Sequence, residues 1–96
     1  MENCIGHVTH YYNKIGVAVL SLTAGLKIHD TIQIIGHSTD FIQKVRSLEI
    51  NHQKIQSAGP EAEVALKVDE PVHAGDKVFL LPEGALLEEG MDRIRE

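Results

Sequence analysis

Short runs of alternating apolar residues, each closed by turn residues, limit this chain to one class of fold. Residues 63–68 alternate strictly, with Val64, Leu66 and Val68 on one side of the predicted strand. Gly, Asn, Asp and Pro recur at short intervals, and residues 1–82 contain no long stretch with the 3.6-residue period of an amphipathic helix. Together these patterns predict an all-β domain.

Six strands are expected from this pattern. The run 17–22 is apolar on both faces, which is typical of a central strand. In the run 41–50 the two-residue period fails, and one extra residue between Val45 and Leu48, a β-bulge, would restore it. A flat sheet of this size would leave two edges and one face uncovered, so closure into a six-stranded barrel is expected. The predicted strands are 5–12, 17–22, 31–35, 41–50, 63–68 and 77–81, and the predicted core is Val8, Val19, Leu20, Ile32, Ile34, Val45, Val64, Leu66, Val78 and Leu80.

One pattern occurs twice in the chain. Residues 26–35 and 72–81 each read as a tight turn that ends in Asp, followed by an alternating strand. Gly75 in the second copy tolerates positive φ at little cost. His29 holds the same position in the first copy, 46 positions earlier, and His accepts this conformation better than most residues. The repeat predicts a pseudo-symmetric barrel.

The end of the sequence has a different character. Residues 83–96 contain five acidic residues and two basic ones, and Leu87, Met91 and Ile94 have helical spacing. We therefore divide the chain into a β-barrel domain, residues 1–82, and a short acidic C-terminal tail, residues 83–96, expected to be helical.

Charge and aromatic content limit the partners that the chain can bind. Nine Lys and Arg against fourteen Asp and Glu give a formal net charge of −5. Nonspecific binding to nucleic acid depends on several cations on one face, so no binding to duplex DNA is expected. Trp is absent and only four residues are aromatic, which argues against a base-stacking platform.

Location follows from cysteine content and from one apolar run. Cys4 is the only cysteine, which excludes an intrachain disulfide and favours a reducing compartment. The apolar run 15–26 is too short to span a bilayer. The residues before it lack the cluster of positive charge that begins a secretory signal. We therefore expect a cytoplasmic protein with no membrane contact.

Motifs for catalysis, metal binding or cofactor binding are missing. His7 and His10 are separated by an odd number of residues, so a regular strand places them on opposite faces, and the other four histidines fall in turns and loops. Cys4 lies outside any catalytic signature, and the chain has no phosphate-binding Gly-rich loop. We expect no enzyme activity, no metal or cofactor, and no GTP binding by the chain alone.

Several motifs together resemble domain II of translational GTPases of the elongation factor Tu type. They are the sequence VRSLEINH at 45–52, the turn at 25–30 and the turn at 72–76, in an order and spacing that cover about residues 5–81. This resemblance implies a closed six-stranded Greek-key barrel. The chain departs from the family at His29, where a Gly is usual, and at the turn that contains Gly59 and Pro60.

The resemblance also implies candidate site residues. Glu49 matches a carboxylate that contacts the terminal ribose of aminoacyl-tRNA, and His52 lies near a basic position of that family. A carboxylate can accept a hydrogen bond from a ribose 2′-hydroxyl. Together with Lys44 and Arg46, these residues are the candidate surface for RNA or a partner protein. The alternative for Glu49 is an ordinary solvated strand residue.

Two functions remain open at this point. The first is a non-enzymatic, elongation-factor-like binding or adaptor module, with tRNA, the ribosome or a translation-associated protein as its partner. The alternative follows from a similar barrel that ends some collagenase-like peptidases. It is an accessory barrel that docks onto a separately encoded enzyme such as a peptidase. Copurification with RNA or ribosomes would favour the first, and copurification with an enzyme subunit the second.

Overall fold

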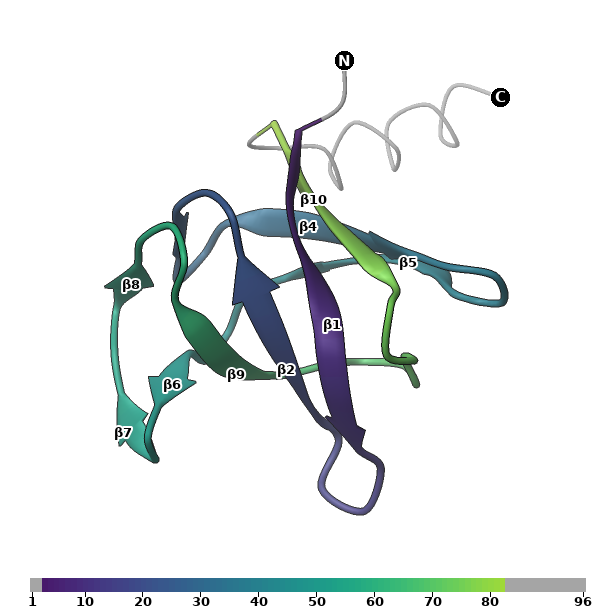
Figure 1. Ribbon diagram of the computed structural model, residues 1–96, viewed down its shortest axis with the longest axis horizontal. Helices are drawn as coiled ribbons and strands as arrows, with labels where there is room; N and C mark the ends of the chain where they lie inside the picture. The colour runs from purple at the N-terminus through teal and green to yellow at the C-terminus, as the bar shows by residue number, and fades with distance from the viewer. Residues whose placement is uncertain (1–2, 83–96) are drawn as a thin grey trace, which may run out of the picture.

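The computed structural model describes residues 3–82, and these residues form an all-β domain (Figure 1). The all-β prediction is therefore confirmed, although the number of strands is larger than the expected six. The strands are β1 (Cys4–Tyr12), β2 (Val17–Leu22), β3 (Leu26–Lys27), β4 (Thr31–Ile35), β5 (Asp40–Lys44), β6 (Glu49–Ile50), β7 (Gln53–Lys54), β8 (Ser57–Ala58), β9 (Glu63–Lys67) and β10 (Lys77–Leu81).

Eight of these strands form one antiparallel sheet in the order β5-β4-β10-β1-β2-β9-β6-β7. The short strands β3 and β8 pair separately, with Leu26 opposite Ala58. The first and last strands are neighbours, since β1 pairs with β10 and His7 lies opposite Lys77. Figure 1 shows β1, β2 and β10 side by side, with β9 and β6 beyond β2.

A single hydrophobic core lies within the curved sheet. Eight of the ten predicted core residues are at most 1% exposed, and the two exceptions, Val19 and Leu80, are half-buried. Val19 alternates with Ala18 and Leu20, which are buried, so its side chain leaves β2 on the outer face. The other buried apolar side chains are Ile5, Ala18, Leu22, Leu26, Phe41, Leu48, Val68 and Val72.

The link between β5 and β6 departs from the prediction. These two strands follow each other in the chain but lie at opposite ends of the main part of the sheet, and β6 pairs with β9. Between them Val45 and Leu48 are buried, whereas Arg46 is exposed. The expected continuous strand over 41–50 with a single bulge is therefore wrong. Instead, residues 45–48 connect β5 to β6 without strand structure, with two apolar side chains buried and Arg46 exposed between them.

A closed barrel is not found in residues 3–82, where no strand ladder joins β5 to the other end of the sheet. A buried side chain bridges this gap. Gln43, 2% exposed, donates from Nε2 to the carbonyl of Lys67 at 3.0 Å, and its Oε1 accepts from the N–H of Asp69 at 2.7 Å. One amide thus holds the end of β5 against the chain that leaves β9. The Greek-key topology stays a prediction.

The repeated turn is confirmed in detail. His29 and Gly75 both have positive φ, 80° and 96°. In each turn the N–H of the Asp donates to the carbonyl of the residue three positions earlier, at 3.1 Å in 27–30 and 3.0 Å in 73–76. Each Asp carboxylate in turn accepts the N–H of that earlier residue, at 2.9 and 2.8 Å. These are type II turns, which require positive φ at the third residue.

The strands that follow these turns are related by the same spacing. β4 pairs antiparallel with β10, and Gln33 lies opposite Phe79 at the middle of the pair. These two residues are also 46 positions apart, so they are equivalent in the two copies. A local pseudo-twofold axis therefore passes between them and relates the two turns.

A bulge in β1 changes the placement of two histidines. The register puts His7 opposite Ser21 and His10 opposite Val19, with a shift between these pairs. Ser21 and Val19 lie on one face of β2, so His7 and His10 share a face as well. The prediction of opposite faces is wrong, because the extra residue restores the parity. No three His, Cys, Asp or Glu side chains converge as a metal site anywhere in residues 3–82.

Two further expectations concern the C-terminal tail and the membrane. The predicted helical tail, residues 83–96, lies outside the described residues. Within the described part of the chain, no helix is long and apolar enough to cross a membrane.

Candidate functional site

An apolar groove of about 550 Å³ opens between two β-hairpins. The β1–β2 hairpin forms one wall and the β6–β7 hairpin forms the other. β9 lies between β2 and β6 in the sheet and forms the floor. The apolar wall contains Tyr12, Ile15, Val17 and Val19, and the polar side contains Glu49, Asn51, His52 and Glu63.

Exposed apolar side chains distinguish this groove from the rest of the described surface. Tyr12 is 48% exposed and Ile15 is 59% exposed, and among residues 3–82 only Ile35 is another large hydrophobic residue of this kind. Val17 and Val19 extend the same apolar wall along the outer face of β2. Contiguous apolar surface of this kind marks interaction sites more often than solitary exposed residues do.

Hydrogen bonds hold the β1–β2 hairpin loop in place. The N–H of Gly16 donates to the carbonyl of Tyr12 at 2.9 Å, and the N–H of Val68 donates to the carbonyl of Gly16 at 3.0 Å. Lys67 Nζ also donates to the carbonyl of Ile15 at 3.1 Å. The end of β9 and the residue after it therefore hold the backbone of the loop at Ile15 and Gly16.

A tight turn builds the opposite wall. Asn51 and His52 have φ values of 53° and 66° and connect β6 to β7 in two residues. Positive φ at both central positions is the mark of a type I′ turn, whose twist matches that of the flanking strands. Asn suits this turn well, and His52 takes the second position with its side chain on the groove.

Two carboxylates give the groove a negative charge. Glu49 on β6 lies opposite Ala65 on β9. Glu63 is two residues from Ala65, so both carboxylates leave the sheet on the same face. Within residues 3–82, neither carboxylate takes part in a hydrogen bond or an ion pair.

Two of the four residues predicted as one binding surface lie at the groove. Glu49 and His52 line the groove, but Lys44 and Arg46 do not. Lys44 ends β5, where it lies opposite Thr31. Between Lys44 and Glu49 the chain passes from β5 to β6, which pairs with β9. The role of the four residues as a binding surface stays a prediction.

Arg46 has a partner of its own. Its guanidinium forms an ion pair and hydrogen bonds with the carboxylate of Asp69. The hydrogen bond first, and the charge of Asp69 second, raise the pKa of Arg46 above its ordinary value. Arg46 is therefore engaged in fastening residues 45–48 to the segment after β9.

The sequence contained an overlooked signal for the groove. The run 17–22 is apolar on both faces, the pattern that predicts a central strand. In the structure Ala18, Leu20 and Leu22 face the core, and Val17 and Val19 face the groove. Apolar residues on a second face that no other element covers are the pattern that could have identified it.

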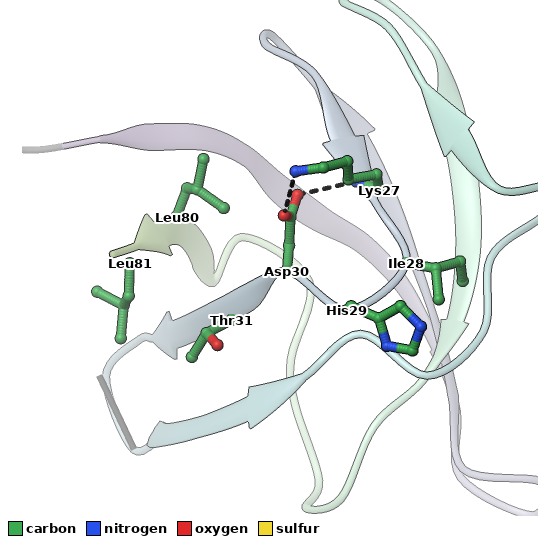
Figure 2. Close-up of a pocket in the computed structure, with 7 residues that line it drawn as sticks. All are labelled: Lys27, Ile28, His29, Asp30, Thr31, Leu80 and Leu81. Atoms are coloured by element: carbon green, nitrogen blue, oxygen red, sulfur yellow. Dashed lines mark hydrogen bonds and ion pairs between the residues drawn. The ribbon is translucent and has the colours of Figure 1, made fainter. Parts of the chain in front are cut away.

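A second concavity, of about 300 Å³, lies at the first repeated turn (Figure 2). Leu80 and Leu81 of β10 border it on one side. Figure 2 shows Asp30 bonded to both the backbone N–H and the ammonium of Lys27, the latter at 2.8 Å. Its charged groups are engaged with each other in maintaining the turn, so the apolar groove is the stronger candidate site.

Comparisons with known proteins found similar proteins whose names include a protease and a peptidase. No family model matches the chain. An uncharacterized protease of Methanocaldococcus jannaschii is 41% identical over 80 residues, which are 82% of this chain and 20% of that protein. The chain thus spans about a fifth of the length of the curated relative that it matches.

The fold also occurs in solved structures. The "C-terminal domain of Geobacillus thermoleovorans putative U32 peptidase" superposes with a TM-score of 0.79 and 18% identity, over 83% of this chain and 93% of that one. Its selenomethionine variant gives a TM-score of 0.76 and 19% identity, over 79% and 96%. At this identity the comparison shows a shared fold.

These findings correct the resemblance to domain II of the elongation-factor family. The similar proteins carry peptidase names, so the interpretation as an elongation-factor-like, translation-associated, RNA-binding module is wrong. The physical reason lies in the motifs that suggested it. The turns at 25–30 and 72–76 are repeated type II turns, each closed by an Asp, that lead into β4 and β10. Such turns start strands, so they indicate a fold and not a function.

Proposed function

We propose that this chain is a non-catalytic accessory domain that associates with the catalytic region of a peptidase-type protein. The observation that carries the proposal is the 41% identity to a segment amounting to 20% of a much longer protein named as a protease. A match of this size to a minor part of a protein is what an accessory domain would give. The association with a separately encoded peptidase is part of this proposal.

The solved domains support the same function. A domain of this fold, described as the C-terminal part of a U32 peptidase, was crystallised as a separate unit. The groove supports an accessory role in a different way. Fixed hairpins that present exposed apolar side chains suit contact with another protein surface, because the contact orders few groups on binding. A cytoplasmic location is retained as a prediction.

Reconstitution with the remainder of the archaeal relative tests the proposal. The full 96-residue chain would be titrated by calorimetry into that protease lacking the 80 residues that match. Peptide hydrolysis would be measured with a mixture of unstructured peptide substrates. We expect a one-to-one complex and no hydrolysis by the 96-residue chain alone.

Two outcomes would overturn the proposal. The first is the absence of binding at the highest concentration that both proteins tolerate, together with an inactive fusion. In that fusion this chain replaces the 80-residue segment of the relative, and peptide hydrolysis is measured. The second is peptide hydrolysis by the 96-residue chain alone, with an activity that stays with the chain through three different chromatography columns. Hydrolysis would show that the chain carries its own catalytic site.

A further inference from the structure

We propose that the groove between the β1–β2 and β6–β7 hairpins docks a segment of the peptidase catalytic region that presents an apolar side chain next to Lys or Arg. This inference rests on the proposed function, which it extends by naming the contact face and the chemistry of the partner. The name "docking groove" is used below for the surface formed by Tyr12, Ile15, Val17, Glu49 and Glu63.

The apolar wall supplies the affinity of this contact. Ile15 stands at the tip of a loop that four hydrogen bonds fix to β1 and to the end of β9, so docking does not have to order its backbone. Tyr12 lies at the base of the same loop, 48% exposed, and combines an apolar ring with a polar tip. Aromatic residues of this type are frequent anchors at protein interfaces.

The carboxylates define the sign of the partner. Glu49 and Glu63 leave the same face of the β6–β9 pair, at the side of the groove opposite Ile15. Neither carboxylate forms an ion pair within residues 3–82. Lys54 lies opposite Glu49 in the β6–β7 pair, and Lys67 donates to the carbonyl of Ile15, but neither lysine lines the groove. Because these carboxylates are the only charged side chains among the described residues that line the groove, a segment whose apolar residue enters beside Ile15 would complement them by carrying Lys or Arg next to it.

Charge also argues against the two nearest alternative occupants. A second copy of this chain has the same net charge of −5 and would bring four groove carboxylates together. Residues 83–96 carry five acidic residues against two basic ones, so they also suit this negative groove poorly. A basic and apolar segment of a different protein is the occupant that the groove complements.

Two pairs of variants test the apolar wall and the charges separately. Binding to the truncated archaeal protease would be measured for Ile15→Ser and Tyr12→Ser, with Ile35→Ser as the matched control. Ile35 is 37% exposed and lies on β4, outside the docking groove. The double variant Glu49→Lys/Glu63→Lys would be compared with Glu70→Lys, which changes an exposed carboxylate outside the groove. Thermal unfolding of each variant checks that it folds.

The expected results differ between groove and control. Ile15→Ser and Tyr12→Ser should each weaken binding at least about tenfold, as truncation of a central anchor does. Binding of the native chain should weaken as salt rises. Glu49→Lys/Glu63→Lys should bind more weakly at low salt, and its salt dependence should be reversed because the groove then repels a cation. Ile35→Ser and Glu70→Lys should bind within about twofold of the native chain.

The outcomes separate this inference from the proposed function. Equal binding by native chain and all groove variants would overturn the docking groove and leave the accessory function standing. Absence of binding by the native chain would overturn both. A dimer of this chain that Ile15→Ser dissociates would also overturn the inference, because the occupant would then be a second copy.

Discussion

His29 and Gly75 occupy the same position in two type II turns that a local twofold relationship connects. Both residues have positive φ, and both donate their backbone N–H to the carbonyl of a fully buried valine, Val45 at 2.8 Å and Val8 at 2.7 Å. The two turns therefore make the same backbone contacts with different side chains. Only Gly adopts this conformation without a steric cost.

Replacing His29 with Gly should stabilise the protein. A side chain in the left-handed region costs about 1–2 kcal/mol, and the greater freedom of Gly in the unfolded chain offsets about 0.5–1 kcal/mol of that gain. His29 is exposed, so no packing is lost. We expect His29→Gly to raise the free energy of unfolding in urea by about 0.5–1 kcal/mol. Gly75→Ala should lower it, and a loss of stability in both variants would contradict the argument.

Gly36 is expected to tolerate no side chain. A Cβ at this position would overlap the carboxylate of Asp76, which is 5% exposed and accepts the N–H of His73 at 2.8 Å. The carboxylate cannot retreat without losing that bond. Gly36→Ala should therefore lower the free energy of unfolding by about 1–3 kcal/mol.

Gly59→Ala is the control for this substitution. A Cβ at Gly59 would meet no atom within 4 Å. Its free energy of unfolding should lie within about 0.5 kcal/mol of the native value. Equal destabilisation of both variants would show that the close approach to Asp76 is not the cause.

Gln43 is predicted to be a major polar contributor to stability. Gln43→Leu keeps a side chain of similar size but leaves the carbonyl of Lys67 and the N–H of Asp69 without their buried partner. Each such group costs about 1–3 kcal/mol. Urea denaturation should show this loss, and hydrogen exchange at the amide of Asp69 should accelerate.

A second glutamine on the neighbouring strand provides the comparison. Gln33 donates to Asp40 at 2.8 Å in an exposed bond. Gln33→Leu should change the free energy of unfolding by less than about 1 kcal/mol, because water replaces the lost partner. Similar losses in the two variants would indicate that burial of the Gln43 amide contributes nothing.

Nucleic acid provides a test of the charge argument. Arg46 is paired with Asp69, and the chain carries a net charge of −5, so it lacks the surplus of cations that releases counterions from DNA. We expect no measurable binding to duplex DNA at physiological salt. A fluorescence anisotropy titration with a labelled 20-base-pair duplex checks this. Saturable binding at micromolar protein would refute it.

Local patterns predicted much of the fold, and long-range placement set the limit. The alternation at 63–68 identified β9, whose Val64 and Leu66 are buried, and the repeated Asp turns were found in full. Apolar periodicity could not show that the chain leaves the sheet at Val45 and returns at the other side. That crossing depends on two distant strand pairings, β4–β5 and β6–β9.

The candidate site was likewise predicted only in its local part, and its long-range assembly was not. Glu49 and His52 were identified as candidates and do line the groove, but through a resemblance that proved wrong. Tyr12 ends the predicted strand 5–12 and Ile15 begins the apolar run 15–26, and neither position alone indicates a groove. Their role depends on the β6–β7 hairpin that stands across from them. An opposing wall supplied by residues some forty positions away has no signature in a single sequence.

The pairing of β1 with β10 has a consequence for how this domain reaches its folded state. Val8 in β1 donates its N–H to Asp76, and His7 lies opposite Lys77, so the central strand gains its second neighbour only when the last strand is present. During synthesis one edge of β1 would stay unpaired until the end of β10 has left the ribosome. Such long-range closure is slow compared with hairpin formation. Refolding from urea should therefore be limited by the pairing of β10 with β1. Intermediates that form before this step would expose the unpaired edge of β1 to neighbouring chains.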